Sequence, residues 1–209
     1  MKKKSVLFTL AIATALAASY AFISSGEKYE MLSIGKKAPK ADVRMSDISG
    51  ETVSLNDIKK DNGLLVIFSC NTCPFVLAWE DRYPALAEQC MKKNIGMVLI
   101  NSNEARRKGV DSMEEMKKHA ADKNYNCFYA IDENSEVANA FGAKTTPHVY
   151  LFDKNMELVY RGAIDDTEGK DEVSPKEHYL QNAIDNLAAG KKVNPAETKS
   201  IGCSIKRVS

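Results

Sequence analysis

The sequence has almost no net charge. Its 29 lysine and arginine residues are balanced by 28 aspartate and glutamate residues, which leaves a formal charge of +1 at pH 7. Proteins that bind nucleic acids usually carry a clear surplus of basic side chains, so the composition gives no reason to expect DNA or RNA as a partner. Internal repeats and low-complexity tracts are lacking too. The 209 residues suffice for one well-packed domain with short extensions.

Histidine is scarce as well, with three residues in the chain. None of them forms a recognisable pair of metal ligands, and the sequence holds a single C-x-x-C, formed by Cys70 and Cys73. A structural zinc ion usually takes four ligands, often from two such pairs. The sequence therefore predicts no metal site and no cofactor.

Long apolar runs are missing except at the N-terminus. Lysines at positions 2–4 precede an apolar stretch that ends in small residues, and S-Y-A ending at Ala21 fits a signal-peptide cleavage site. We expect residues 1–21 to be a signal peptide, or else an uncleaved anchor, because the run from Val6 to Ile23 just reaches the length of a spanning helix. Either alternative predicts export to the periplasm or another extracytoplasmic compartment.

An exported chain places a constraint on its thiols. There are five cysteines, Cys70, Cys73, Cys90, Cys127 and Cys203. Outside the cytoplasm a thiol either escapes oxidation or takes part in a redox cycle. Because five is odd, at least one thiol is unpaired or is paired only transiently.

The middle of the chain alternates between apolar runs and amphipathic segments. Continuous apolar runs predict buried strands over 64–68, 97–100 and 127–131. Helical patterns are expected from 76 to 90 and over 112–123, 135–141 and 175–189. Hairpins are expected at 42–55, turning at Gly50, and at 149–161. This order predicts an α/β sandwich of one domain with a mixed central sheet.

The first long helix has one apolar stripe. It consists of Val76, Trp79, Tyr83, Leu86 and Cys90, while charged residues such as Glu80 are expected mostly off this face. Core packing is the favoured role of Trp79, and a lid over an active-site groove is the alternative. We expect Cys90 on this stripe, and Cys127 at the start of a strand, to be inert core thiols.

The C-x-x-C lies where a buried strand ends and this helix begins. The free N–H groups and partial positive charge of a helix N-terminus stabilise a thiolate, which is the reactive form of cysteine. Pro74 suits a first helical turn because it has no N–H to lose. With two residues between them, one cysteine can attack a disulfide and the other can resolve the mixed disulfide. A structural disulfide is the weaker alternative, since it would close a very small loop.

Four segments extend this interpretation. They are F-S-C-N-T-C-P-F at 68–75, I-G-K-K-A-P at 34–39 with G-E-T-V-S-L at 50–55, K-T-T-P-H-V-Y-L-F-D at 144–153, and the hairpin through D-D at 165–166. Together they resemble the thioredoxin superfamily, and more closely its redoxin-type (AhpC/TSA-like) members in bacterial envelopes. The resemblance implies a thioredoxin-like three-layer α/β/α sandwich over 34–193 with an N-terminal β-hairpin extension. A linker at 22–33 would precede it, and 194–209 would form a C-terminal extension with Cys203.

The resemblance also implies an activity. It predicts a thiol–disulfide oxidoreductase in which Cys70 is the exposed attacking thiolate and Cys73 resolves. A cis peptide before Pro147 would pack against the cysteines, and the backbone of Thr146 would pair with a bound peptide. The partners would be proteins with cysteine pairs or disulfides, with a membrane-bound electron donor as a further expectation. Ser69 replaces the tryptophan of thioredoxins proper, and Asn71-Thr72 replaces their Gly-Pro, so the direction of electron flow stays open.

Two other functions stay open. A peroxidase of the peroxiredoxin type is less favoured, because the proline of its P-x-x-x-T-x-x-C motif is absent here. Two soft thiolates could also hold Cu(I), but the copper-carrying relatives space their cysteines by three residues and add a distant histidine.

Several further residues could assist the site. Cys203 is either a third redox thiol that reaches back to the C-x-x-C or a residue of a buried or disordered end. Asp165 and Asp166 could move a proton during exchange, although a solvated turn is favoured. His148 could face the site. His119 and His178 are expected at the surface without chemical neighbours.

Overall fold

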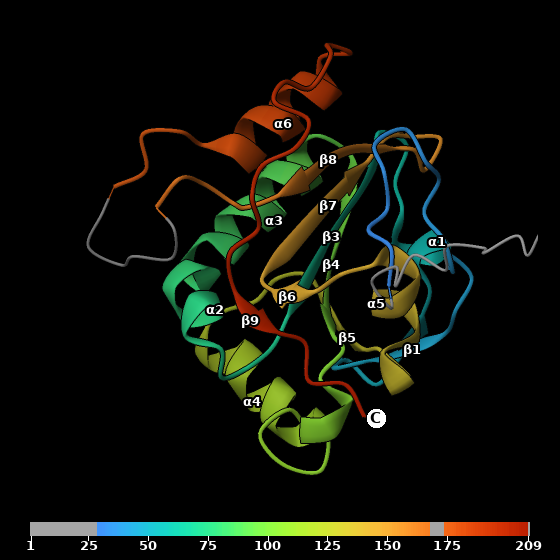
Figure 1. The fold of residues 1–209 in the computed structure, drawn as a ribbon, viewed down its shortest axis with the longest axis vertical. Helices are drawn as coiled ribbons and strands as arrows, with labels where there is room; N and C mark the ends of the chain where they lie inside the picture. The colour runs from blue at the N-terminus through green and yellow to red at the C-terminus, as the bar shows by residue number, and fades with distance from the viewer. Residues whose placement is uncertain (1–28, 168–173, 209) are drawn as a thin grey trace, which may run out of the picture.

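The computed structural model describes residues 29–167 and 174–208, so the predicted signal peptide lies outside the described residues. Within these ranges, seven strands form one mixed sheet in the order β2-β1-β5-β4-β3-β7-β8 (Figure 1). The strands are β1 (Met45–Asp47), β2 (Thr52–Val53), β3 (Gly63–Ser69), β4 (Ile95–Asn101), β5 (Phe128–Ile131), β7 (His148–Phe152) and β8 (Leu158–Gly162). The central strands β3, β4 and β5 run parallel, and β1, β7 and β8 pair antiparallel with their neighbours.

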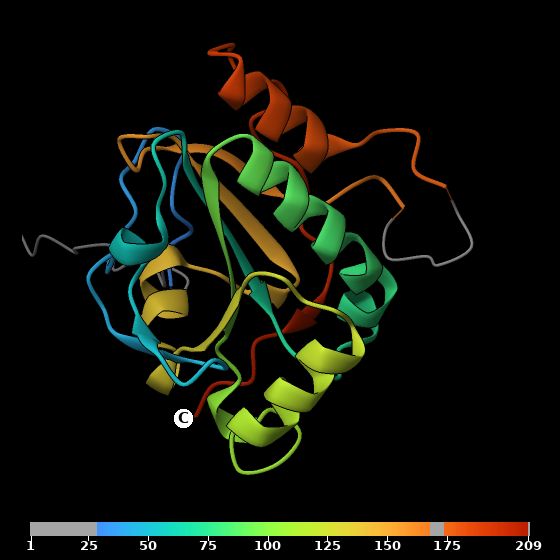
Figure 2. The same ribbon diagram turned by 180° about the vertical axis from the view of Figure 1, so that it is seen from behind.

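Helices cover both faces of the sheet. They are α1 (Leu55–Ile58), α2 (Pro74–Trp79), α3 (Tyr83–Lys92), α4 (Met113–Asp122), α5 (Glu136–Phe141) and α6 (Tyr179–Ala188). The side chains of α2, α3, α4 and α6 pack on one face, and those of α1 and α5 pack on the other (Figure 2). The predicted three-layer α/β/α sandwich is therefore confirmed. No helix among the described residues is long and apolar enough to span a membrane.

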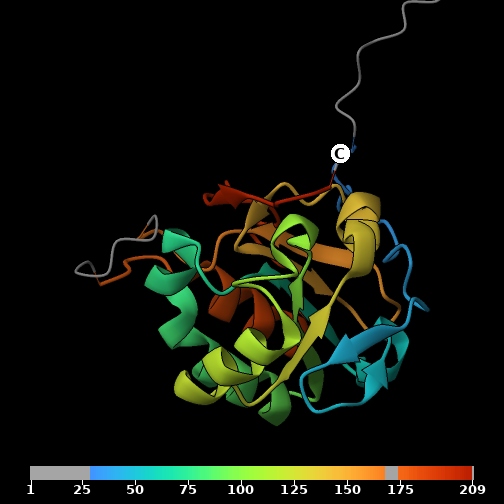
Figure 3. The same ribbon diagram turned by 90° about the horizontal axis from the view of Figure 1, so that it is seen from below.

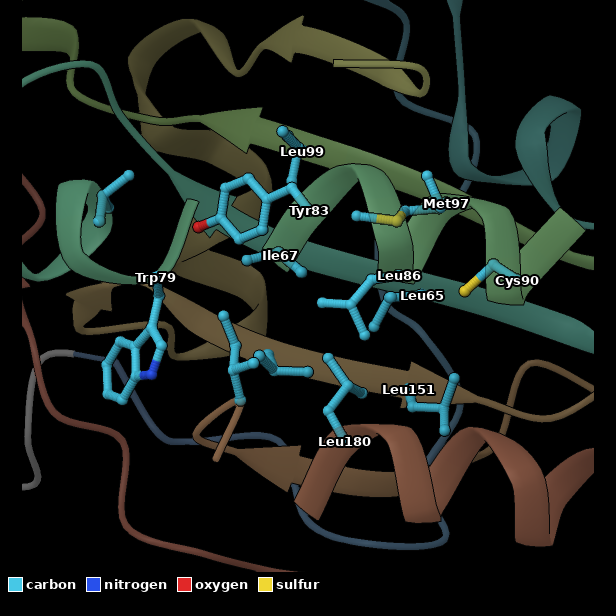
Figure 4. Close-up of a cluster of buried hydrophobic side chains, with 14 of the residues drawn as sticks. Leu65, Ile67, Trp79, Tyr83, Leu86, Cys90, Met97, Leu99, Leu151 and Leu180 are labelled. Carbon is cyan, nitrogen blue, oxygen red and sulfur yellow. The ribbon is translucent and has the colours of Figure 1, made fainter. Parts of the chain in front are cut away.

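The central strand β3 is buried on both faces, as its continuous apolar run predicts. Leu65 and Ile67 point toward α2 and α3, where they pack below Tyr83 and Leu86 (Figure 4). Leu64, Val66 and Phe68 alternate with them and fill the core below α1 and α5. Burying each such side chain contributes about 1.5–3 kcal/mol. This double anchoring fixes the carboxyl end of β3, from which the C-x-x-C projects.

The helix expected from 76 to 90 is divided. α2 ends at Trp79, a 3₁₀ turn covers Glu80–Arg82, and α3 begins at Tyr83. Pro84 explains the second start, because a residue without an N–H is tolerated in the first turn of a helix. The five stripe residues are nevertheless all buried, so the predicted apolar face is confirmed.

Glu80 departs from its predicted place on the polar side of this helix. It is 1% exposed. Its carboxylate lies 2.6 Å from both Nε2 of His119 and Nζ of Lys123, and it accepts a hydrogen bond of 3.0 Å from the hydroxyl of Tyr125. The expectation that His119 has no chemical neighbours is therefore wrong. The 3₁₀ turn rotates Glu80 inward, toward α4. His178, in contrast, is exposed as expected.

The remaining elements follow the sequence pattern closely. Ser54 caps α1 through a reciprocal capping box with Asp57, and the hairpin of β1 and β2 joins the sheet through β5. The last helix begins at Tyr179, four positions after the expected start at Pro175.

A second, two-stranded sheet lies outside the main one. β6 (Thr145–Thr146) pairs antiparallel with β9 (Cys203–Ser204), which brings the C-terminal segment back to the end of the main sheet. In Figure 3 this segment runs in red along the outside of the molecule. The segment before it also contacts β8, because Thr198 N–H donates to the carbonyl of Arg161 at 3.0 Å.

Candidate active site

Cys70 and Cys73 lie in the connection between β3 and α2. The strand ends at Ser69, Cys73 is the N-cap residue of α2, and Pro74 is its first residue. The sequence predicts this junction correctly. Cys70 and Cys73 are, however, only 2% and 4% exposed, so the prediction that Cys70 is an exposed thiol is wrong. All five cysteines lie within the described residues, and each is a free thiol.

The segment before β7 packs directly on this pair. The Thr146-Pro147 peptide is cis, as the resemblance predicts. The Oγ1 atom of Thr146 lies 3.3 Å from Sγ of Cys70, and its carbonyl oxygen lies 3.1 Å from Sγ of Cys73. Two motifs more than 70 positions apart in the sequence therefore meet at the same two sulfur atoms.

Cys203 completes the cluster of cysteines. In the antiparallel pairing of β6 with β9, it lies opposite Thr146. Cys203 lies close enough to Cys73 for each of the two thiols to shift the pKa of the other. A cavity of about 310 Å³ is lined by Cys70, Cys73 and Cys203 together. The structure thus places Cys203 beside the C-x-x-C rather than on a remote chain end (Figure 1).

The environments of the two C-x-x-C sulfurs differ. Cys73 has Cys70 and Cys203 as neighbouring thiols at the wall of one cavity. These neighbours hold the pKa of Cys73 below its usual range although burial opposes them. The neighbouring Cys73 thiol, followed by burial, raises the pKa of Cys70. The pKa of Cys73 is thus the lower of the two, the reverse of the order in the sequence interpretation, while its S–H donates to the carbonyl of Thr146 at 3.1 Å.

A buried carboxylate holds the loop between the two cysteines. Oδ1 of Asp111, which is fully buried, accepts hydrogen bonds from the amide of Asn71 at 3.0 Å and from the side chain of Asn101 at 2.8 Å. The Asn71 side chain donates to the carbonyl of Val110 at 2.7 Å and accepts from the hydroxyl of Tyr129 at 2.8 Å. These bonds fix the backbone on which Cys70 and Cys73 sit.

The sequence interpretation missed this network. Its signal is the N-S-N that follows the apolar run of β4, since Asn101–Asn103 end a strand next to β3. The carboxyl ends of neighbouring parallel strands meet at one edge of a sheet, where polar side chains often gather around a site.

Trp79 has the role of a core residue, and the alternative of a lid is wrong. It is fully buried, and its indole Nε1 donates to Oδ1 of Asp165 at 2.7 Å and to Oγ1 of Thr167 at 2.9 Å. Asp165 is 2% exposed and is paired with Nε of Arg82 at 2.7 Å. The expectation of a solvated turn therefore fails for Asp165, because its carboxylate ties α2 and the following turn to the segment after β8.

Asp166 lies apart from the cysteines. Its Oδ1 accepts from the amides of Lys176 at 2.9 Å and Glu177 at 3.2 Å. Those bonds hold the pKa of Asp166 below its usual value. The carboxylate thus organises the approach to α6, and nothing in its surroundings within the described ranges connects it with proton transfer at the C-x-x-C.

His148 points away from the thiols. Along β7, Val149 and Leu151 face the core that contains Cys70 and Cys73, whereas His148 and Tyr150 face the opposite side of the sheet. The ring of His148 lies 4.6 Å from that of Tyr150. The expectation that His148 faces the site is therefore wrong, because the alternation of side chains in a strand places it on the other face.

Cys90 and Cys127 lie away from the site. Cys90 is 1% exposed, and Cys127 is partly exposed beside a separate cavity of about 540 Å³. Burial raises the pKa of both thiols to about 12. Within residues 29–167 and 174–208, no group of three or more histidine, cysteine or acidic side chains is arranged to hold a metal ion.

Comparison with known proteins identifies the family of this chain. A model of the AhpC/TSA family matches residues 34–161. No curated protein matches the chain. An uncharacterized conserved protein from Geobacillus kaustophilus is 37% identical, with 86% of this chain and 94% of that chain covered and a TM-score of 0.80. A hypothetical protein from Sinorhizobium meliloti 1021 is 29% identical over 86% of this chain and 97% of that chain, with a TM-score of 0.79.

A third structure shares the fold alone. It is a secreted Mycobacterium tuberculosis disulfide oxidoreductase homologous to E. coli DsbE, which is 12% identical. The comparison covers 72% of this chain and 97% of that chain, with a TM-score of 0.53.

Proposed function

The protein belongs to the AhpC/TSA family, and we propose that it works within this family as a thiol–disulfide oxidoreductase whose reactive pair is Cys70 and Cys73. The observation that carries the proposal is the position of Cys70 and Cys73 at the start of α2, where Thr146 contacts both sulfur atoms. The two thiols lie together at one site and the pKa of Cys73 is lowered, as a dithiol centre requires.

The exchange proceeds in two steps. The Cys73 thiolate attacks one sulfur of a partner disulfide, which forms a mixed disulfide and releases the partner's other sulfur as a thiolate. Cys70 then attacks the Cys73 sulfur, and its proton passes to one partner thiolate while the other takes up a proton from water. The partner leaves as a dithiol, and the two electrons it has gained come from the oxidation of Cys70 and Cys73 to their disulfide. Thr146 contacts both sulfurs and holds them in place for this transfer.

The electrons reside in the cysteines, so the reaction needs no cofactor. Because the disulfide must be reduced again after each turnover, the proposal includes an electron donor, which in an exported protein would be membrane-bound. The expected partners are proteins with cysteine pairs or disulfides. The proposal of export depends on residues 1–21 alone. Cell fractionation with mass measurement of the N-terminus tests it: cleavage after Ala21 gives a chain that starts at Phe22.

The test of the activity is the reduction of insulin disulfides with dithiothreitol as electron source. Cys70→Ser and Cys73→Ser should each abolish the stimulated rate. Cys90→Ala removes a buried thiol outside the site and serves as the matched control. Full activity in both serine variants would refute the assignment.

A peroxidase is the second candidate. It is favoured by the lowered pKa of Cys73 together with the family match. In that reaction the Cys73 thiolate would be oxidised by peroxide to a sulfenic acid, which would condense with the Cys70 thiol to a disulfide and water. Peroxide consumption no faster than that of free cysteine would eliminate this candidate.

A further inference from the structure

The C-terminal strand occupies the edge of Thr146 that a bound peptide would use. β9 pairs antiparallel with β6, and the register places Cys203 opposite Thr146. The pairing continues on the far side, where Ile205 N–H donates to the carbonyl of Lys144 at 3.0 Å and Lys206 N–H donates to Oδ1 of Asn103 at 2.8 Å. The chain thus supplies its own strand to this edge.

The sequence of β9 and its flanks fits this place closely. A Cβ atom on Gly202 would come within 2.2 Å of the carbonyl oxygen of Thr146, so only glycine allows this approach. Ile205 is buried in the core below α5, and Ile201 packs on the core that holds the C-x-x-C. Ile201 and Cys203 therefore pack on the core of the C-x-x-C, and Ile205 anchors the end of the strand in the other core.

The three sulfurs of the cluster differ in accessibility. Cys70 and Cys73 are almost fully buried, whereas Cys203 is partly exposed at the wall of the cavity that all three line. Arg106 and Lys206 line the same cavity. A disulfide that approaches from solvent therefore meets Cys203 more readily than it meets the buried pair.

We propose that Cys203 is the third cysteine of the redox centre and that β9, acting as an internal partner strand, passes the disulfide between the buried C-x-x-C and the solvent. This inference rests on the proposed function of Cys70 and Cys73. It adds a residue and a route to that function, because a partner cannot pair with Thr146 while β9 lies there.

The transfer is an exchange without net oxidation. Cys203 gives up its proton to water, and its thiolate attacks the Cys73 sulfur of the Cys70–Cys73 disulfide. The Cys73–Cys203 bond forms, the Cys70–Cys73 bond breaks, and Cys70 leaves as a thiolate that takes up a proton. Cys73 is the attacked sulfur because it lines the same cavity as Cys203 and the two thiols shift each other's pKa. The reverse exchange returns the disulfide to the buried pair.

Peptide mapping without reduction tests the proposal directly. The full chain and its Cys70→Ser and Cys203→Ser variants are equilibrated with oxidised glutathione, alkylated and digested. We expect Cys70→Ser to accumulate a Cys73–Cys203 linkage, since the serine cannot take the disulfide back, and Cys203→Ser to contain only Cys70–Cys73. A Cys70→Ser protein that keeps Cys203 alkylatable under all conditions would overturn the proposal.

A second variant separates the strand from its thiol. Gly202→Val should force β9 off Thr146, with loss of the Cys73–Cys203 linkage and retention of Cys70–Cys73. Gly109→Ala is the matched control, because its new Cβ meets no atom closer than 3.8 Å. An unchanged linkage in Gly202→Val would contradict the role of the strand.

The insulin assay distinguishes the two proposals. If the wild type reduces insulin but Cys70→Ser never forms the Cys73–Cys203 linkage, the third-cysteine inference fails and the proposed function stands. If the linkage forms but the wild type reduces neither insulin nor another protein disulfide, the proposed function fails and the three-cysteine centre stands.

Discussion

The indole Nε1 of Trp79 donates a hydrogen bond of 2.7 Å to Oδ1 of Asp165, and the other carboxylate oxygen of Asp165 lies 2.7 Å from Nε of Arg82. One buried carboxylate therefore joins the end of α2 to the segment after β8. Since α2 begins at the C-x-x-C, this contact stabilises the helix whose N-terminus carries the reactive pair.

Replacing this carboxylate should destabilise the protein. Asp165→Asn keeps an acceptor for Trp79 but removes the charge opposite Arg82, which is 18% exposed at its side chain. Loss of a hydrogen bond to a charged group costs about 1.5–3 kcal/mol. Urea unfolding measures the change. Asp185→Asn, in an exposed pair with Lys93, is the control, and an equal effect of both substitutions would contradict the account.

His148 should make stability depend on pH. Burial, reinforced by the charges of Arg161 and Lys144, lowers the pKa of His148 to about 3, whereas an unfolded histidine titrates near 6.5. The unfolded state therefore binds more protons between these values, and stability falls as the pH decreases from 6.5 toward 3. Between pH 7 and pH 5 the wild type should lose about 2 kcal/mol of its free energy of unfolding through His148, and His148→Leu should not show this loss.

The control for that experiment is His178→Leu, which changes an exposed histidine. Urea unfolding at the two pH values should give the same pH dependence for this control and for the wild type. If His148→Leu also retains the wild-type pH dependence, His148 is not held neutral by its surroundings.

Glu80 should also make stability depend on pH, in a more acidic range. Burial alone would raise its pKa, but hydrogen bonds from His119 and Lys123 outweigh burial and hold the pKa of Glu80 below its usual value. The contribution of Glu80 to stability is therefore complete above about pH 4.3, which is the pKa of an unfolded glutamate. It is lost as the pH falls through the lower pKa of Glu80 in the folded state.

Glu80→Gln should accordingly be less stable than the wild type at pH 7, and the gap should close in acid. Unfolding curves at pH 7 and at successively lower pH values measure it. Glu88→Gln, in an exposed pair with Lys92, should show little difference at any pH. A gap that stays constant into acid would mean that the charge of Glu80 is not what stabilises the fold.

The thiolate assignment is open to a spectroscopic test. Ultraviolet thiolate absorbance of the reduced protein should show one cysteine that titrates below its usual range, and Cys73→Ser should remove this transition because the neighbouring thiols lower the pKa of Cys73. Cys127→Ser should leave it unchanged, since burial raises the pKa of Cys127 to about 12. Loss of the transition in Cys70→Ser alone would restore the roles that the sequence suggested.

The fold and half of the site are predictable because their signals are local. The apolar run predicts the buried strand β3, and Pro74 after the C-x-x-C predicts the start of α2. The resemblance adds the cis peptide between Thr146 and Pro147 and its position next to the cysteines. The helix N-terminus at Cys73 could be located from spacing alone.

The remainder depends on packing between distant segments. The apolar stripe of the helix does not predict the 3₁₀ turn that rotates Glu80 toward α4. The residues around His148 likewise do not indicate on which face of β7 it lies relative to the thiols. The position of Cys203 follows from a strand pairing across 57 residues, between Thr146 and Cys203, which sequence patterns do not specify.

The measurement that tests the central claim most directly is a redox titration of the Cys70–Cys73 pair. The Cys203→Ser variant, whose titration is confined to this pair, is equilibrated with dithiothreitol or glutathione buffers, and its disulfide is quantified by alkylation. The account predicts a two-electron transition, with a tenfold change in the ratio of disulfide to dithiol for about every 30 mV. A pair that remains as two free thiols in every buffer would contradict the account.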